Sequence, residues 1–400
     1  MLRRNVLKVA AGAVAAAMLL TGAAAAQDVI KIGASAPKTG PLAGGAEVTH
    51  WPALHLWVHD VNERGGIDVG GKKMKVELTE YDDRTSGEEA IKNYQRLATV
   101  DKVDFVVAPY STGLNIAAAP IIAQYGYPQL GATSVGDGFE KLAAQWPSSF
   151  WLLGSSTAFA EDLAGVLVKL RDAGAIGNKV AVVNVADAFG IELMNAGKPA
   201  LTAAGFEIVY ETSYPIDQQD FAPIIQAAQA AKPDAFVAFS YPPDTFGLTE
   251  QAKIADLKVG AFYVGVATAF PAYAAANGAA AEGVLGAGAV NPEAPGMPEW
   301  RARHKEVTGM EADYWASAMT YASLQILEQA ITRAGSLDKA AVLAEIKKAP
   351  FDTILGAMDL SSNVNPKFWT VGQWQGGVYY GVAARGFDDI KEPIAKKGWN

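Results

Sequence analysis

The feature that most constrains the fold is an alternation of short apolar runs with longer helical segments, which occurs in two separate series. The first series contains VIKIGASAP, MKVELTEYDD and VDFVVAP, and the second contains KVAVVNV, DAFVAFS and AFYVGV. Strand-like runs of about 5–8 residues separated by helices of about ten or more predict βαβ units and parallel sheets. We therefore expect an α/β protein with two lobes. The helices predicted within the two series cover residues 46–64, 88–99, 116–125, 158–173, 191–204, 221–231 and 245–255.

The C-terminal part of the chain has a different pattern. It is mostly helical after the run GVLGAGAV, with predicted helices at residues 298–308, 315–334 and 338–348. An aromatic strand, FWTVGQW, and a second run, GGVYYGVA, follow near the end. Because no low-complexity linker separates the two series, we expect lobes joined by several short crossings rather than by one tether.

The N-terminus resembles an export signal. Residues 1–26 have a cationic start, an apolar stretch and an A-x-A ending at Ala24 and Ala26, which predicts a signal peptide cleaved near Ala26. A transmembrane helix is the alternative reading, and the pattern leaves the Sec and twin-arginine routes open. The chain has no cysteine to carry a lipid and no later apolar run of about 18–20 residues. We expect a soluble, periplasmic, monomeric mature protein without a membrane anchor.

Charge and cysteine content exclude several functions. The chain has 33 Lys and Arg residues against 42 Asp and Glu residues, and a formal net charge of −9. An acidic chain without basic clusters is unsuited to binding a phosphate backbone, so we expect no nucleic-acid partner. The absence of cysteine also excludes disulfides, cysteine-ligated zinc, iron–sulfur clusters and thiol nucleophiles.

Several motifs are too weak to indicate catalysis or a cofactor. Residues 66–73 have the spacing of a phosphate-binding loop, but Lys73 stands where a magnesium-ligating Ser or Thr is required, so we interpret them as a turn. His55 and His59 lie one helical turn apart without a third ligand, which favours ordinary helix residues over a metal site. The sequence also lacks a G-x-S-x-G elbow. We expect no catalytic residue, no cofactor and no metal.

Small hydroxyl-bearing residues follow two of the predicted strands. Tyr110, Ser111 and Thr112 come after VDFVV, and Ala132 and Thr133 come after PQL. In open parallel sheets, ligands bind beyond the carboxyl ends of strands, where backbone N–H groups and helix N-termini can hold an anion. The same residue types also cap helices. The pattern alone leaves both roles open.

These segments together resemble a known family. KIGASAPKTGPLAGG, NERGGI, VVAPYSTG and PQLGATS are similar to the corresponding segments of type I periplasmic solute-binding proteins of ABC importers, in the leucine/isoleucine/valine-binding group. The likeness runs from about residue 31 to residue 374. It implies two Rossmann-like lobes joined by three hinge strands and a partnership with an inner-membrane ABC permease. By analogy, lobe 1 comprises residues 28–150 and 288–367, and lobe 2 comprises residues 151–287 and 368–400.

The resemblance also implies a binding site. In the family, the ligand carboxylate is held by two loops that match Ser111-Thr112 and Ala132-Thr133 of this chain. Phe189 stands where the family usually has a tyrosine, and Tyr241 matches another aromatic residue of the cleft. Tyr110, Tyr314, Trp51, Trp315 and Phe270 are further aromatic candidates for the cleft.

One departure from the family bears on the ligand. Amino-acid binders place a glutamate for the ligand ammonium just after the strand ending at Gly265, where this chain has Val266 and Ala267. A buried ammonium without a counter-charge costs several kcal/mol. Either Asp187, Asp244 or another acid replaces the glutamate, or the ligand has no amine.

We therefore expect a receptor that captures a small amine-free carboxylate, aromatic or apolar, by hinge closure. The alternatives within the class are a branched-chain amino-acid binder and an amide or urea binder. The alternative of another class is an exported α/β enzyme.

Overall fold

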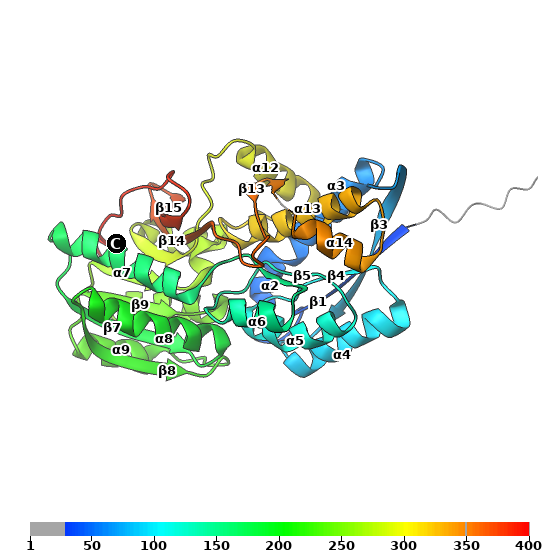
Figure 1. The fold of residues 1–400 in the computed structure, drawn as a ribbon. Helices are drawn as coiled ribbons and strands as arrows, with labels where there is room; N and C mark the ends of the chain where they lie inside the picture. The colour runs from blue at the N-terminus through cyan, green and yellow to red at the C-terminus, as the bar shows by residue number, and fades with distance from the viewer. Residues whose placement is uncertain (1–28, 349, 400) are drawn as a thin grey trace, which may run out of the picture.

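The computed structural model describes residues 29–348 and 350–399. The predicted signal peptide, residues 1–26, lies outside the described residues. The described chain forms two α/β lobes that lie side by side in Figure 1. We call the unit around the N-terminal sheet the first lobe and the other the second lobe, as the resemblance predicts.

The first lobe is built on a four-stranded sheet with the order β2-β3-β1-β4, in which β1 pairs in parallel with both β3 and β4. A short parallel pair, β5-β6, and a hairpin, β12-β13, complete its strands. The strands of this lobe are β1 (Val29–Ala36), β2 (Ile67–Val69), β3 (Lys72–Asp82), β4 (Phe105–Val107), β5 (Gln129–Gly131), β6 (Ser149–Trp151), β12 (Phe351–Thr353) and β13 (Gly356–Met358).

The second lobe is built on a seven-stranded sheet with the order β15-β14-β11-β10-β9-β7-β8. Strands β8, β7, β9, β10 and β11 run parallel to one another. Strand β14 pairs antiparallel with β11 on one side and with β15 on the other. The apolar run KVAVVNV is buried along almost its whole length, as expected for a strand covered on both faces. The strands are β7 (Lys179–Val185), β8 (Glu207–Tyr214), β9 (Ala235–Phe239), β10 (Ala261–Val264), β11 (Val284–Ala287), β14 (Phe368–Gln375) and β15 (Val378–Arg385).

Helices pack around both sheets, those of the first lobe from two separate parts of the chain (Figure 1). The first-lobe helices are α2 (Ala43–Thr49), α3 (Trp51–Glu63), α4 (Gly87–Arg96), α5 (Thr112–Gln124), α6 (Phe139–Gln145), α12 (Met297–Thr308), α13 (Ala316–Ala334) and α14 (Lys339–Ile346), and a π-helical turn, Leu97–Asp101, follows α4. The second-lobe helices are α7 (Ser156–Asp172), α8 (Ala188–Ala203), α9 (Ala222–Ala230), α10 (Pro242–Ile254) and α11 (Pro271–Asn277), with 3₁₀ turns at Val266–Ala269 and Gly278–Ala281. We find no helix among the described residues that is long and apolar enough to cross a bilayer.

The helix predicted at residues 46–64 is wrong in one respect, because the structure contains two helices, α2 and α3, separated at His50. The break follows from Pro52, which has no N–H to donate to the carbonyl of Val48 and is tolerated only in the first turn of a helix. The Val48 carbonyl accepts instead from the Ser317 hydroxyl of α13, at 3.2 Å. The proline therefore ends one helix and starts the next, and α13 takes up the freed acceptor.

The chain passes between the lobes at short segments. One crossing leads from β6 to α7, one follows β11, and one precedes β14. The backbones of the two lobes also meet away from these crossings, since the N–H of Tyr314 donates to the carbonyl of Ala269 at 3.0 Å. Lobes that touch in this way can enclose a ligand between them.

Candidate functional site

A cavity with about 410 Å³ of unfilled volume lies between the two lobes. Its wall contains hydroxyl, aromatic and aliphatic side chains and one carboxylate, without a lysine, arginine or histidine among its residues. The residues that line it are Thr49, Tyr110, Ser111, Thr133, Val135, Leu153, Phe189, Tyr241, Val266, Phe270, Asp313, Trp315 and Ala316.

The polar side of the cavity is formed where β4 and β5 end. Ser111 is the N-cap of α5, and its hydroxyl accepts from the N–H of Leu114 at 3.3 Å. The backbone N–H of Ser111 donates to the Thr133 hydroxyl at 3.2 Å, and that hydroxyl donates to the carbonyl of Pro109 at 3.2 Å. Ser111 therefore both caps α5 and lines the cavity. The Thr133 hydroxyl connects the loop after β5 to the loop after β4.

Ser111 has a strained backbone, with φ of 81° and ψ of 156°. A non-glycine residue in this region costs about 1–3 kcal/mol and persists only where its surroundings hold it. The carbonyl of Ser111 accepts from the backbone N–H of Asn115 at 3.1 Å and from its side-chain amide at 2.9 Å. Gln129 donates in turn to Asn115, and the hydroxyl of Ser149 donates to Gln129 at 2.9 Å. This buried amide network fixes the strained loop.

The opposite side of the cavity is aromatic and belongs to the second lobe. Phe189 lies in the first turn of α8, Tyr241 immediately precedes α10, and their ring centroids are 4.9 Å apart. The Tyr241 hydroxyl donates to Asp187 at 3.0 Å, and Asp187 also caps α8 by accepting from the N–H of Gly190 at 2.9 Å. Helix capping therefore fixes the position of both rings.

Three carboxylates are candidates to replace the missing glutamate, the buried Asp244 and Asp313 and the half-buried Asp187, and all of them already accept hydrogen bonds. Asp244 accepts from the hydroxyl of Tyr214 at 2.7 Å and from the N–H of Tyr241 at 2.9 Å. Burial raises the pKa of Asp187 and of Asp313, and it raises the pKa of Asp244 to about 6.

Only Asp313 of these three carboxylates lines the cavity. It accepts from the N–H of Ala316 at 3.0 Å and from the N–H of Ser317 at 2.7 Å, which are the first turn of α13. Each bond satisfies one of the N–H groups left free at a helix start. This arrangement is that of a helix cap, which any ligand group would have to share.

The structure brings five of the predicted site residues together and places four others outside the wall of this cavity. Tyr110, Ser111, Thr133, Phe189 and Tyr241 line it, as do the further candidates Phe270 and Trp315. The hydroxyl of Thr112 donates to the carbonyl of Val135 at 3.2 Å and accepts from the N–H of Val135 at 3.1 Å. Ala132 and Ala267 are buried in their own lobes. The Tyr314 ring lies over the guanidinium of Arg301 at 4.0 Å.

Sequence reasoning missed several residues of the wall. Thr49 ends α2, Leu153 lies in the crossing after β6, and Asp313 and Ala316 flank the start of α13. Val135 lies in the loop after β5, and Val266 begins the 3₁₀ turn after β10; neither was predicted to line the site. A signal for Asp313 was available in the sequence. It is an acidic residue two positions before Trp315, where a helix was predicted to start, and acidic residues there often cap the helix.

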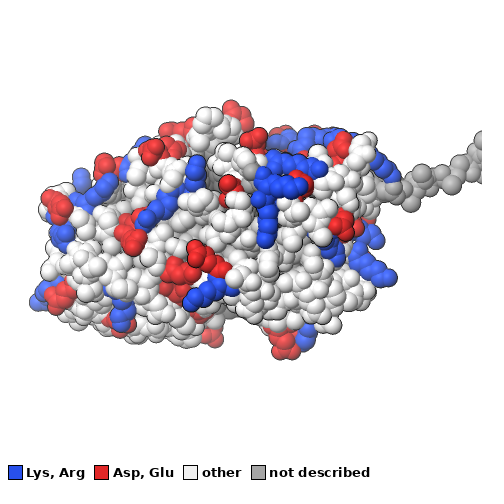
Figure 2. Space-filling view, viewed as in Figure 1, with Lys and Arg blue, Asp and Glu red and all other residues white. Residues whose placement is uncertain are grey.

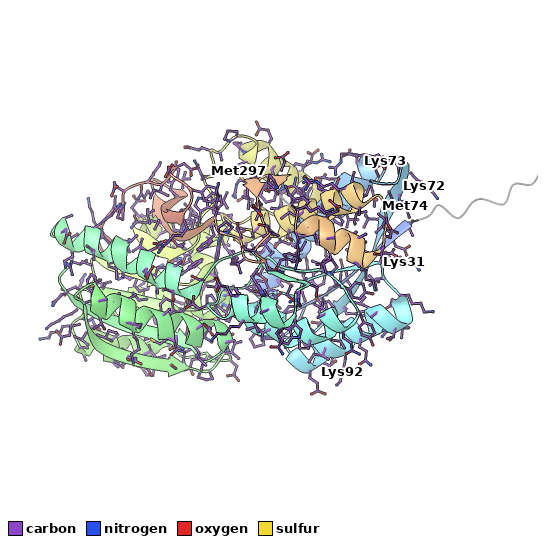
Figure 3. The ribbon with its side chains drawn as sticks, viewed as in Figure 1. Lys31, Lys72, Lys73, Met74, Lys92 and Met297 are labelled. Carbon is purple, nitrogen blue, oxygen red and sulfur yellow. The ribbon has the colours of Figure 1, made fainter. Side chains whose placement is uncertain are left out.

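The weak motifs have structural roles. Residues 66–73 form the turn and flanks of the β2-β3 hairpin, as predicted, and Lys72 and Lys73 lie with Lys31 and Met74 at the end of the molecule remote from the second lobe (Figure 3). His55 pairs with Glu80 at 2.5 Å. Ligand atoms of His59, Asp60 and Glu63 lie within 4.8 Å of one another, but Arg303 pairs with both carboxylates. Acidic and basic side chains are interspersed over the face shown in Figure 2.

Two α/β lobes that enclose a small cavity at the carboxyl ends of their strands define a class of hinged ligand-binding proteins. The family model described as "Periplasmic binding protein" matches residues 29–377 of this chain. The chain therefore belongs to the periplasmic binding protein family, and its fold is the type I fold of that family, as the sequence predicted.

Known proteins of this kind resemble the chain over most of its length. A protein of Brucella melitensis named "Leu/Ile/Val-binding protein homolog 7" is 25% identical, covering 91% of this chain and 94% of its own. A solute-binding protein from Rhodopseudomonas palustris BisB5, solved with 3,4-dihydroxybenzoic acid, has a TM-score of 0.76 and 22% identity and covers 92% of this chain and 99% of its own. The protein LivJ from Streptococcus pneumoniae, solved with isoleucine, has a TM-score of 0.75 and 18% identity over 92% of this chain and 100% of its own.

Proposed function

We propose that this protein is the substrate-binding component of an ABC importer, which captures a small amine-free carboxylate in the periplasm and delivers it to an inner-membrane permease. The observation that carries the proposal is the cavity between the lobes, with hydroxyl and backbone donors on one side and aromatic rings on the other. Ligand contacts to both lobes favour the closed arrangement over an open one. A permease that recognises the closed form then receives only loaded protein.

The lobes and the export route are part of this proposal. Lobe 1 would comprise residues 28–150 and 288–367, and lobe 2 residues 151–287 and 368–400, because the chain crosses between the sheets near these boundaries. Cleavage near Ala26 would release a monomeric protein without a membrane anchor.

The site residues divide between a carboxylate end and an apolar end. Ser111 would donate to the ligand carboxylate together with the backbone of the Thr112 and Ala132 loops, since a helix N-terminus favours an anion. Thr133 would join them by turning its hydroxyl hydrogen away from the carbonyl of Pro109, which keeps the Asn115 amide as a donor. Phe189, Tyr241 and Phe270 would enclose the apolar part of the ligand. Tyr110 lies beside Ser111 on the polar side and would contact both parts.

The state of the carboxylates supports an amine-free ligand. Position 267 holds a buried alanine, and Asp187 and Asp244 lie outside the cavity wall with their oxygens bonded to tyrosines and backbone N–H groups. A ligand ammonium would have to find its counter-charge at Asp313, which already caps α13. A carboxylic acid with an aromatic or apolar body has no such requirement.

A branched-chain amino-acid binder is the second candidate, and Asp313 is the observation that favours it. An ionised carboxylate has about four acceptor positions, so Asp313 can accept from an ammonium while it caps the helix. Such a ligand would be held at its carboxylate by Ser111 and at its amine by Asp313.

Ligand-dependent stability distinguishes the two candidates. The purified protein, refolded once to remove any bound ligand, would be melted with leucine, isoleucine, valine, benzoate, 4-hydroxybenzoate, short fatty acids, amides and urea. A compound present at about 100 times its Kd adds about 2.7 kcal/mol of stability. Stabilisation by an amine-free carboxylate and not by leucine is the expected result, and stabilisation by leucine alone contradicts it.

The variant Asp313→Asn sharpens this test, because the amide oxygen of asparagine can still accept from the N–H of Ser317, whereas the charge and the bond from Ala316 are removed. For an amine-free carboxylate we expect unchanged or tighter binding, since a nearby negative charge is lost. Asp338→Asn is the matched control, since Asp338 caps α14 by accepting from the N–H of Ala341 at 2.8 Å and lies outside the cavity wall. A tenfold loss of ligand affinity in Asp313→Asn alone would identify an ammonium ligand.

A further inference from the structure

One wall residue, Trp315, has a polar atom without a partner. Its side chain lines the cavity and is 2% exposed, and among the described residues its indole Nε1 has no hydrogen-bond partner. Buried indole N–H groups usually find an acceptor, because leaving a donor unsatisfied costs more than its bond would contribute. Because Trp315 lines the cavity, an oxygen of a molecule bound there is available as the acceptor.

The indole ring is held in place by its neighbours. Gly288, with φ of +60°, lies against it so closely that a Cβ at position 288 would be 2.2 Å from a ring atom. The ring of Phe159, from α7 of the second lobe, lies 5.8 Å from it between centroids. Trp315 thus lies beside the crossing that follows β11 and contacts both lobes. A ring fixed in this way presents its N–H in one direction.

Three other tryptophans also have a buried Nε1 without a partner among the described residues, at positions 151, 300 and 369. None of them lines the cavity between the lobes. The unpartnered N–H is thus not unusual in this protein, and what distinguishes Trp315 is its place in the wall. The other tryptophans supply matched controls.

The charge beside Trp315 indicates which ligand atom meets it. Asp313 is two residues away in the same wall, so a ligand carboxylate placed there would be repelled. The helix N-terminus at Ser111 is the favourable place for the carboxylate. A neutral oxygen, by contrast, accepts from the indole without that penalty.

We infer that the Trp315 indole N–H recognises a second, neutral oxygen of the ligand, which makes the ligand a carboxylic acid with a hydroxyl, ether or carbonyl oxygen on its body. This inference rests on the proposed function and adds a specificity-determining residue to it. The ligand carboxylate is held at the Ser111 loop, and Trp315 selects among carboxylic acids of similar size.

The test compares acids that differ by one oxygen at nearly constant volume. Calorimetry would measure the Kd of 4-hydroxybenzoate against 4-methylbenzoate, and of 3-hydroxybenzoate against 3-methylbenzoate. We expect the wild-type protein to prefer the hydroxy acid of at least one pair by about three- to tenfold, the value of one neutral hydrogen bond. In Trp315→Phe that preference disappears, whereas in Trp300→Phe it is retained.

The outcomes separate the two claims. Equal binding within both pairs by the wild type, or a preference that persists in Trp315→Phe, overturns the role of Trp315 and leaves the proposed function in place. Binding of leucine with none of the four acids bound contradicts the proposed ligand class itself. Melting curves of the two variants report whether each is folded.

A second measurement needs no variant to bind ligand. In protein labelled with ¹⁵N at tryptophan, the Trp315 indole resonance is identified by its loss in Trp315→Phe. We expect 4-hydroxybenzoate to move this resonance downfield and 4-methylbenzoate to leave it close to its unliganded position. The same displacement with both acids would mean that the indole donates to something other than the second oxygen.

Discussion

The two sides of the cavity are built by different means. On the first-lobe side, the strained Ser111 loop is fixed by a network of buried side-chain amides that runs through Asn115 and Gln129. On the second-lobe side, Phe189 and Tyr241 are placed by helix caps, and the polar atoms nearby are bonded to one another. The first side thus carries hydroxyl groups held by hydrogen bonds, and the second offers an apolar surface.

Under the proposed function, this difference gives polar recognition to the first lobe and apolar enclosure to the second. A hydrogen bond to a charged group is about twice as strong as a neutral one, but it requires donors held in place. The first lobe meets that requirement with buried polar contacts, which are costly when any member is left unpaired. The second lobe gains from burying aromatic surface, which tolerates small displacements. Polar recognition should therefore be fragile in the first lobe, and apolar enclosure robust in the second.

The largest effect should follow from removing the two hydroxyls of the polar side. Ser111→Ala combined with Thr133→Ala should weaken carboxylate binding by about 2–4 kcal/mol, because two charge-assisted hydrogen bonds are lost. Titration calorimetry with the carboxylate found in the ligand screen measures this as a Kd increase of about thirtyfold or more.

A matched pair of hydroxyls in the second lobe serves as the control. Ser240 and Thr245 are both buried, and their hydroxyl oxygens are 2.7 Å apart, but neither lines the cavity. Ser240→Ala with Thr245→Ala should change the Kd by less than about threefold. Equal losses in the two double variants would show that the comparison between the lobes is mistaken.

The next effect concerns the support of the strained loop. Asn115→Ala should lower the free energy of unfolding by about 2–3 kcal/mol, since it removes the two hydrogen bonds that the side-chain amide donates to the carbonyls of Pro109 and Ser111. It should also weaken ligand binding, because the Asn115 amide is one of the groups that hold Ser111 at its positive φ. Urea unfolding and calorimetry measure the two effects.

The second lobe again offers a counterpart, Asn184, which is buried and bonded to Val185 and Ser213. Asn184→Ala should lose comparable stability and leave the Kd of the folded protein nearly unchanged. If it impairs binding as much as Asn115→Ala does, buried amides matter for general stability alone and the first-lobe network has no special role in recognition.

A third prediction uses the pH dependence of stability in the second lobe. Burial raises the pKa of Asp244 to about 6, above its ordinary value of 3.8. Between these values the native state binds more protons than the unfolded state, so the free energy of unfolding falls as pH rises. The fall attributable to Asp244 is about 2 kcal/mol between pH 4 and pH 6.

Asp244→Asn should remove that part of the slope, which is read as the difference between wild-type and variant urea midpoints at several pH values. Taking the difference cancels the titration of other groups, such as Asp83, whose pKa is raised to about 7 by burial. A constant difference across the range would mean that Asp244 is ionised throughout and that its bonds from Tyr214 and Tyr241 outweigh its burial.

Most of the long helices and strands could be predicted from the sequence, but the first residues of two helices could not. The helix predicted at 298–308 is observed at Met297–Thr308, but that predicted at 116–125 begins at Thr112, and that predicted at 191–204 begins at Ala188. Both helices start directly after a capping residue, Ser111 or Asp187, and each has a glycine in its first turn. Glycine weakens a helical pattern, although the cap compensates for it.

The part of the cavity wall that follows from sheet geometry was predictable. Ser111 and Thr133 follow parallel strands, whose carboxyl ends lie at one edge of a sheet. Asp313 and Trp315 were harder to place, because they reach the cavity through α13, about 200 residues further along the chain. No local periodicity encodes where a late helix packs, so Asp313 was missed and Trp315 was only one of several aromatic candidates.

The smallest effect is expected at Tyr314, which lies where the lobes meet. Its backbone bonds to Ala269 and Val290, and its ring covers Arg301, but the residue does not line the cavity. Tyr314→Phe keeps all of these contacts and removes only the hydroxyl, so ligand affinity and stability should both stay within about 0.5 kcal/mol of the wild type. Tyr110→Phe, which removes a hydroxyl from a wall residue, is the matched comparison and should weaken binding more. A tenfold loss in Tyr314→Phe would mean that the ligand reaches past the first-lobe wall, and that polar recognition is shared with the junction of the lobes.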